Sequence, residues 1–171
     1  LLEDLDRAQP VPGAQVVVLS EHVTYWDRLG WKDPYSSAAY TSRQQAYGRR
    51  FRVESVYTPQ MVIDGREQIL GSDARAVKGA VVRAAATSRL AVVISGAGRK
   101  GEVVEFLLEV PQLPERAGFP RADVWVAIAD ERTASDVSKG ENSGRRLTHV
   151  AVARRLAMVG EVTRSRGFTK T

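Results

Sequence analysis

The sequence has no cysteine among its 171 residues. Disulfides, thiolate nucleophiles and cysteine-based metal sites are therefore excluded within this chain. Only two histidines are present, no G-x-S-x-G motif occurs, and no Ser-His-Asp set can be assembled. We therefore assign no catalytic residue within this chain, and we expect neither a metal nor a cofactor.

Long apolar runs are also missing. The longest, around residues 90–95, has the length of a strand, whereas a membrane-spanning helix needs about 20 apolar residues. No signal-peptide pattern opens the chain, and "LLEDLDRAQP" is typical of the last turns of an amphipathic helix. We expect no membrane span, and we expect that residues of the natural protein precede Leu1.

Charge of one sign is present only in modest excess, with a net charge of +5. No motif that combines aromatic and basic residues accompanies it, so nucleic acid is not an expected partner.

Helix and strand patterns alternate in the first half of the chain. "QVVVLS" at 15–20 is a short β-branched run, which predicts a strand buried on both faces. Ser36 or Ser37 is expected to cap a helix that starts at Ala38, and "DG" at 64–65 predicts a hairpin. Ser72 or Asp73 is expected to cap a further helix that ends near Ala85.

After residue 87 the pattern changes to strand-like segments separated by glycine and proline. This pattern predicts an antiparallel β unit. We predict an α/β fold with two domains: a thioredoxin-like domain over residues 1–87, and an antiparallel β-rich C-terminal domain over residues 88–171. The thioredoxin-like order of elements requires one more strand upstream of Leu1.

Pro59 stands at the entrance of the predicted hairpin, in "YTPQMVIDG". Strand entry tolerates a proline because no ladder hydrogen bond is lost there. In a thioredoxin-like domain this proline is cis, and the residue before it, here Thr58, faces the active site. The alternative is a trans-proline that caps an edge strand.

The segment 21–37 is long and irregular, and long loops in compact domains tend to be functional. Two interpretations stay open for it. Its side chains form the wall of a substrate site, or they form a small structural core that fixes the loop. With the hairpin entrance, the predicted substrate-binding residues are Thr58, Pro59, His22, Tyr25, Trp26, Asp27 and Trp31.

Two features of the second half are given structural interpretations. His149 is expected to be a solvated or hydrogen-bonded strand histidine, because a joint site with His22 requires the two halves of the chain to meet. "KGENSGRR" at 139–146 is expected to be a turn between strands rather than a binding loop, because it matches no phosphate-binding motif.

Three stretches resemble the DUF1223 family: "LSEHVTYWDRLGWKDPYSSAAYTSRQQAYGRRF", "VYTPQMVIDGREQILGSD" and "KGENSGRRLTHVAVARRL". The resemblance runs from Val16 to Leu156. It implies a bacterial protein, secreted or periplasmic, with a thioredoxin-like domain and a β-rich extension. It also implies an upstream "TSxGCxxCPPAD" segment and a further strand after residue 171, neither of which is in this sequence.

Two functions follow as expectations. With an upstream C-x-x-C, the intact protein is expected to be a thiol–disulfide oxidoreductase that acts on a protein or peptide thiol or disulfide. The alternative is a non-enzymatic module that binds a protein or peptide on a thioredoxin-like scaffold. Because the missing first strand leaves a sheet edge open, a homodimer is also expected.

Overall fold

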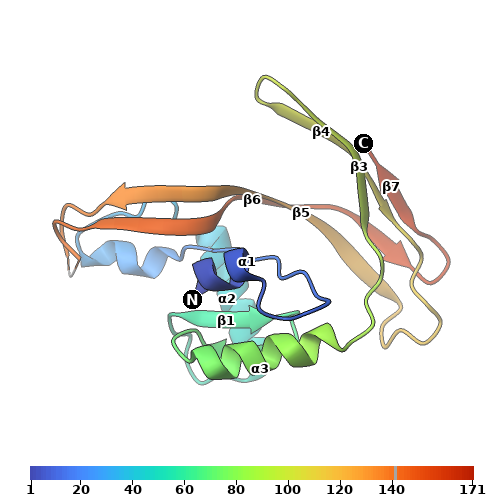
Figure 1. The fold of residues 1–171 in the computed structure, drawn as a ribbon, viewed down its shortest axis with the longest axis horizontal. Helices are drawn as coiled ribbons and strands as arrows, with labels where there is room; N and C mark the ends of the chain where they lie inside the picture. Colours follow the sequence, from blue (N-terminus) through green and yellow to red (C-terminus); the bar gives the residue numbers. More distant parts are fainter. Residues whose placement is uncertain (141) are drawn as a thin grey trace. The chain divides into compact units, whose positions relative to one another are not determined.

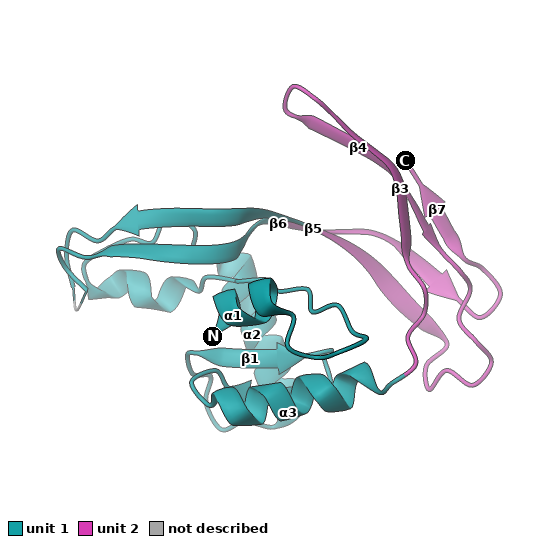
Figure 2. Ribbon diagram, viewed as in Figure 1, with its two compact units in different colours: residues 1–87, 128–154 teal, residues 88–127, 155–171 magenta. Residues whose placement is uncertain are grey.

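The fold is described from a computed structural model of the chain, which describes residues 1–140 and 142–171. The chain forms two compact units, which Figure 2 shows in different colours. Unit 1 combines residues 1–87 with residues 128–154, and unit 2 combines residues 88–127 with residues 155–171. The strand-rich second half therefore supplies a segment to unit 1. The domain boundary at residues 87 and 88 stays a prediction.

Within residues 1–140 and 142–171, every helix lies in unit 1 (Figure 1). They are α1 (Leu2–Ala8), the 3₁₀ helix η1 (Thr24–Leu29), α2 (Ala38–Phe51) and α3 (Ala74–Ala85). Ser37 caps α2, with its Oγ accepting from Ala39 N–H at 3.2 Å, and Asp73 caps α3, with its Oδ1 accepting from Ala76 N–H at 2.9 Å. Both predicted helices and their caps are therefore confirmed.

The predicted hairpin is formed by β1 (Gln60–Ile63) and β2 (Glu67–Leu70), which pair antiparallel. Asp64 and Gly65 both have positive φ, 51° and 64°, as a tight hairpin turn requires. The Thr58–Pro59 peptide bond that precedes β1 is cis.

The prediction of a doubly buried strand over residues 15–20 was wrong. Residues 14–19 belong to no strand, and Val17 is 84% exposed. The Gln9 side chain holds the start of the segment, since it accepts from Val16 N–H at 2.6 Å and donates to Val16 O at 3.0 Å. Val17, Val18 and Leu19 make no backbone hydrogen bond within the described part of the chain.

Ser20, directly after this segment, forms an isolated parallel bridge with Val152. Val152 lies in β6 (Arg146–Thr163), which forms a two-stranded sheet with β5 (Arg121–Asp136). The polar segment between the strands is the predicted turn, and Glu141 in it lies outside the described residues. The bridge places the part of β6 that belongs to unit 1 beside the loop that begins at Glu21.

The core of unit 1 contains Leu5, Val11, Val77 and Val81. Met61, Ile63 and Ile69 pack against it, so α1, α3 and the hairpin share one apolar cluster. Burial of this apolar surface is the main stabilising term for the unit.

Unit 2 contains an antiparallel sheet in the order β3–β4–β7, formed by β3 (Val93–Lys100), β4 (Val103–Val110) and β7 (Phe168–Lys170). Its core contains Leu108, Val110, Leu113, Val124 and Val162. Every residue of the edge strand β3 is exposed. The chain is thus a mixed α/β protein with antiparallel sheets, as the coarse fold prediction stated.

No helix within residues 1–140 and 142–171 has the length and apolar character that crossing a membrane requires.

Candidate functional site

Unit 1 contains an open cleft of about 1110 Å³. On one side it is lined by the segment Val16–Leu19, and on another by β1 and the Thr58–Pro59 entrance. The histidines and part of the aromatic loop also line it. The cleft therefore combines apolar walls with a small number of titratable groups, which is typical of binding sites.

His22 and Asp33 form the central contact of the site. His22 Nδ1 lies 2.6 Å from Asp33 Oδ2, and the two side chains are only 16% and 19% exposed. The second carboxylate oxygen of Asp33 is also hydrogen-bonded, because Tyr35 N–H donates to its Oδ1 at 2.9 Å. Next to an ionised Asp33, Nδ1 is assigned as the nitrogen that donates to the carboxylate, and no hydrogen bond from the described residues reaches Nε2.

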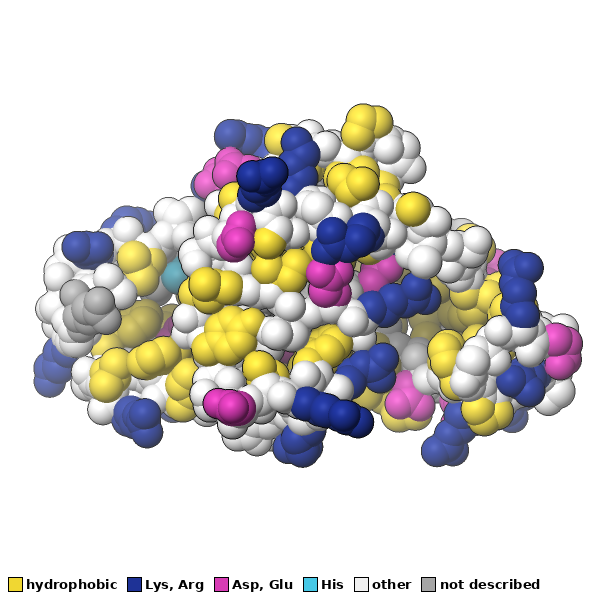
Figure 3. Space-filling view, turned by 90° about the horizontal axis from the view of Figure 1, so that it is seen from below, with side chains coloured by type: hydrophobic (Ala, Val, Ile, Leu, Met, Phe, Trp, Pro, Cys, Tyr) yellow, Lys and Arg dark blue, Asp and Glu magenta, His cyan; other side chains and the backbone are white. Residues whose placement is uncertain are grey.

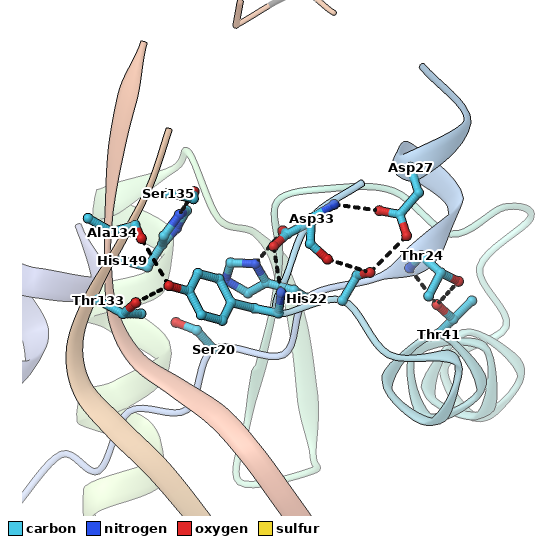
Figure 4. Close-up of polar contacts among 12 residues, drawn as sticks. Ser20, His22, Thr24, Asp27, Asp33, Thr41, Thr133, Ala134, Ser135 and His149 are labelled. Carbon is cyan, nitrogen blue, oxygen red and sulfur yellow. Dashed lines mark hydrogen bonds and ion pairs between the residues drawn. The ribbon is translucent and has the colours of Figure 1, made fainter. Parts of the chain in front are cut away.

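A second histidine lies against the first. The rings of His22 and His149 are 4.8 Å apart and edge-on, and His149 Nε2 lies 2.9 Å from the hydroxyl of the buried Ser135 (Figure 4). The prediction of a hydrogen-bonded strand histidine is therefore confirmed, and β6 also brings His149 beside His22, a joint site that was not predicted. We call His22, Asp33, Tyr35, Ser135 and His149 the histidine cluster.

Tyr35 connects the loop to β5. Its hydroxyl contacts Thr133 Oγ1 and donates to Ala134 O at 2.9 Å (Figure 4). The Arg154 guanidinium lies 5.3 Å from the centroid of the Tyr35 ring, within the range of a cation–π contact. The loop at 21–37 and the β5–β6 strand pair are thus joined by several polar contacts around the two imidazoles.

The environment shifts the pKa of two groups in the cluster. Burial acts to raise the pKa of Asp33, but the hydrogen bonds from His22 and Tyr35 N–H outweigh it, and the pKa is lowered. Burial lowers the pKa of His149, the charge of His22 lowers it further, and Asp33 opposes both. The cluster therefore favours an ionised Asp33 and a neutral His149.

The aromatic loop reaches the hairpin entrance through Trp26. Its indole N–H donates to Thr58 Oγ1 at 3.0 Å, and its side chain remains 48% exposed. Tyr25 packs at 5.4 Å from the Trp26 ring, and its hydroxyl donates to Gln44 Oε1 at 3.1 Å on α2. These contacts hold the Trp26 side chain at the cleft while about half of it stays exposed.

Asp27 fixes the shape of the loop. It accepts from Asp33 N–H at 3.2 Å and from the Ser36 hydroxyl at 2.8 Å (Figure 4). Asp27 therefore acts on the site indirectly, by holding the backbone that carries Asp33 and Tyr35.

The structure places five of the predicted substrate-binding residues at the cleft: His22, Trp26, Trp31, Thr58 and Pro59. Tyr25 and Asp27 lie behind this wall in the contacts given above. The predicted substrate-binding residues did not include Asp33, Tyr35, Ser135 and His149. Asp33 stands in the same loop and was within reach of sequence analysis, whereas the positions on β5 and β6 gave no local signal.

Two further features bear on the chemistry of the cleft. Glu21 and Arg43 line it as an ion pair at 3.1 Å, and burial raises the pKa of Glu21 although Arg43 opposes the shift. No group of three histidine, cysteine or acidic side chains within residues 1–140 and 142–171 could hold a metal ion.

Figure 3 shows histidine atoms at the surface of one face, near exposed hydrophobic side chains. Since the sequence has two histidines and both belong to the cluster, at least one imidazole of the cluster reaches the surface on that face.

Comparisons with known proteins place the chain in a family. The X-ray crystal structure of a protein from Agrobacterium tumefaciens, a structural genomics target, is similar with a TM-score of 0.71 and 28% sequence identity. The similarity covers 98% of this chain and 67% of that one. No curated protein matches the chain. The family described as "Protein of unknown function (DUF1223)" matches residues 1–171. The chain therefore belongs to the DUF1223 family.

Proposed function

We propose that unit 1 is the larger part of a thioredoxin-like domain and that the natural protein is a thiol–disulfide oxidoreductase. One observation carries the proposal: two open backbone edges face the same cleft. One edge is the unpaired backbone of Val17–Leu19, and the other is the side of β1 that β2 does not cover.

Unpaired backbone groups at a strand edge readily take another strand as a partner. A strand between Val16–Leu19 and β1 hydrogen-bonds to both edges and covers Met61 and Ile63. This is the position that the first strand occupies in a thioredoxin-like order of elements. We assign that strand to residues of the natural protein outside this sequence.

The redox cysteines belong to the same outside segment, because this chain contains none. Thr58 and Pro59 then contact the substrate at the end of the cleft, with Trp26 beside them. The expected substrate is a protein or peptide thiol or disulfide. The periplasm or the outside of the cell, which the resemblance implies, is the compartment that we propose for this activity.

A disulfide-exchange assay tests the function. The protein is produced as its natural gene encodes it, and its reduction of insulin and its reshuffling of a scrambled disulfide protein are measured. Activity that disappears when the cysteines are changed to serine supports the proposal. Activity no higher than that of the serine variant, or a gene that encodes no cysteine pair, contradicts it.

A second candidate is a non-enzymatic module that binds a protein or peptide. The exposure of Trp26 and Leu29, 48% and 51%, favours it, because exposed aromatic and aliphatic side chains at the rim of a cleft are typical of recognition surfaces. In this case the two open edges serve to bind a strand of a partner or of a second copy. Binding without disulfide turnover distinguishes this candidate from the first.

A further inference from the structure

The histidine cluster contains a base and the group that orients it. Asp33 Oδ2 holds His22 Nδ1 at 2.6 Å, while no hydrogen bond from the described residues reaches His22 Nε2. A carboxylate–imidazole pair of this kind is the arrangement in which an imidazole accepts a proton from a nucleophile. His22 and Asp33 both line the cleft.

The cluster supplies no nucleophile of its own. The Ser20 hydroxyl donates to Val150 O at 2.7 Å, and the Ser36 hydroxyl is bonded to Asp27. Ser135 is 6% exposed and lies against His149 rather than His22. The proton that His22 can accept must therefore come from a group that enters the cleft.

We propose that His22 accepts the proton of a cysteine thiol that binds in the cleft, with Asp33 as its positioning residue. The S–H bond breaks, the proton moves to His22 Nε2, and the electron pair stays on sulfur, so that an imidazolium and a thiolate face each other. No electron is transferred in this step. The thiol as substrate rests on the proposed function, whereas the base and its orientation rest on geometry alone.

A thiol suits this base better than an alcohol. The ordinary pKa of a thiol, about 8.5, lies only about two units above that of an imidazole. The imidazolium that forms on His22 lies between the Asp33 carboxylate and the new thiolate, and its positive charge stabilises the thiolate.

The surrounding charges leave one site for the proton. Burial lowers the pKa of His149, and a proton on His22 lowers it further, so the two imidazoles do not compete. Arg43 is paired with Glu21, and Arg154 lies over Tyr35 at 5.3 Å and is paired with Asp130 at 3.6 Å. Lys139 also lines the cleft, so its charge needs a control of its own.

The test uses the fact that this chain has no cysteine and gives no background thiol signal. The probe is the capped tripeptide acetyl-Ala-Cys-Ala-amide, and the readout is its alkylation rate by iodoacetamide at pH 7 with increasing protein. We expect roughly tenfold acceleration at saturation, the effect of a one-unit fall in the thiol pKa. His22→Asn should abolish the acceleration. Lys139→Gln removes a positive charge that lines the cleft and should lower the acceleration by much less than His22→Asn does.

No acceleration with the unmodified chain overturns the proposal, and so does equal loss in Lys139→Gln and His22→Asn, which indicates a general charge effect. If His22→Asn fails to fold, the proposal is tested instead by the ¹⁵N resonances of the His22 imidazole in the unmodified chain. A shift of His22 Nε2 toward its protonated value with the cysteine peptide, and none with the serine analogue, supports the proposal; equal responses overturn it. Because no disulfide is involved, this result is independent of the insulin assay.

Discussion

Asp33 Oδ2 lies 2.6 Å from His22 Nδ1, and the edge of that same imidazole lies against His149, which comes from β6. This relationship joins a loop near the start of the chain to a strand near its end. The stability of unit 1 and its expected acid–base behaviour both depend on it.

Asp33→Ala should destabilise unit 1. The substitution removes the acceptor for His22 and for Tyr35 N–H, and loss of hydrogen bonds to a largely buried carboxylate costs about 2 kcal/mol. Denaturant unfolding followed by circular dichroism measures the change. The matched control is Asp136→Ala, whose side chain is 76% exposed and whose pair with Arg146 should contribute at most about 0.5 kcal/mol. Equal losses in the two variants would show that Asp33 has no special structural role.

Stability should fall as the pH drops below about 6.5. The pKa of His149 is lowered in the folded protein from its ordinary value of 6.5, so the unfolded chain binds its proton first and protonation favours unfolding. The lowered pKa of Asp33 adds a second loss at more acidic pH, below its ordinary value of 3.8. Thermal unfolding across this range should show a smaller loss between pH 7 and 5 in His149→Gln than in the unmodified chain. If the melting temperature of His149→Gln depends on pH as that of the unmodified chain does, the loss of stability does not come from His149.

The core of unit 1 offers a direct comparison on one helix. Val77 on α3 is fully buried, whereas Val82 on the same helix is 49% exposed. Val77→Ala should cost about 2 kcal/mol, because it removes two methyl groups and leaves a cavity, and Val82→Ala should cost less than about 0.5 kcal/mol. Chemical denaturation of both variants measures the difference in the free energy of unfolding. Equal losses would show that Val77 is not part of the core.

Gly71 controls the approach of the hairpin to Pro59. A Cβ at Gly71 would lie 3.0 Å from Pro59 Cβ and 3.2 Å from both Met61 Cγ and Pro59 O. Gly71→Ala should therefore displace the hairpin entrance and cost about 1–3 kcal/mol. Gly79→Ala is the matched control, since its Cβ meets only the flexible end of Arg83 and alanine favours a helix by up to about 1 kcal/mol. Melting temperatures that move in opposite directions confirm the prediction, whereas a stabilised Gly71→Ala contradicts it.

Local signals in the sequence were sufficient for several elements. Ser37 and Asp73 cap helices because their side chains can accept from the first turn, and Asp64–Gly65 turns because both positions tolerate positive φ. Each of these signals depends on residues a few positions apart. The sequence therefore predicted the elements of residues 1–87 better than it predicted how they pair.

The failures have a common physical reason. Val16–Leu19 has the composition of a buried strand, but a strand needs partners, and these are decided by contacts far away in the sequence. The meeting of His149 with His22 likewise depends on the bridge between Ser20 and Val152, 132 positions apart by their numbers. The composition and periodicity of the sequence around His149 do not indicate that His22 is its neighbour.

Amide hydrogen exchange at Val17, Val18 and Leu19 tests the central claim most directly. In the 171-residue chain these amides have no backbone partner, and we predict rapid exchange. In the protein produced from its natural gene, a strand between this segment and β1 should slow exchange by roughly a hundredfold or more at the alternate amides that point toward that strand. Equally rapid exchange in both proteins would contradict the thioredoxin-like scaffold and the function proposed for it.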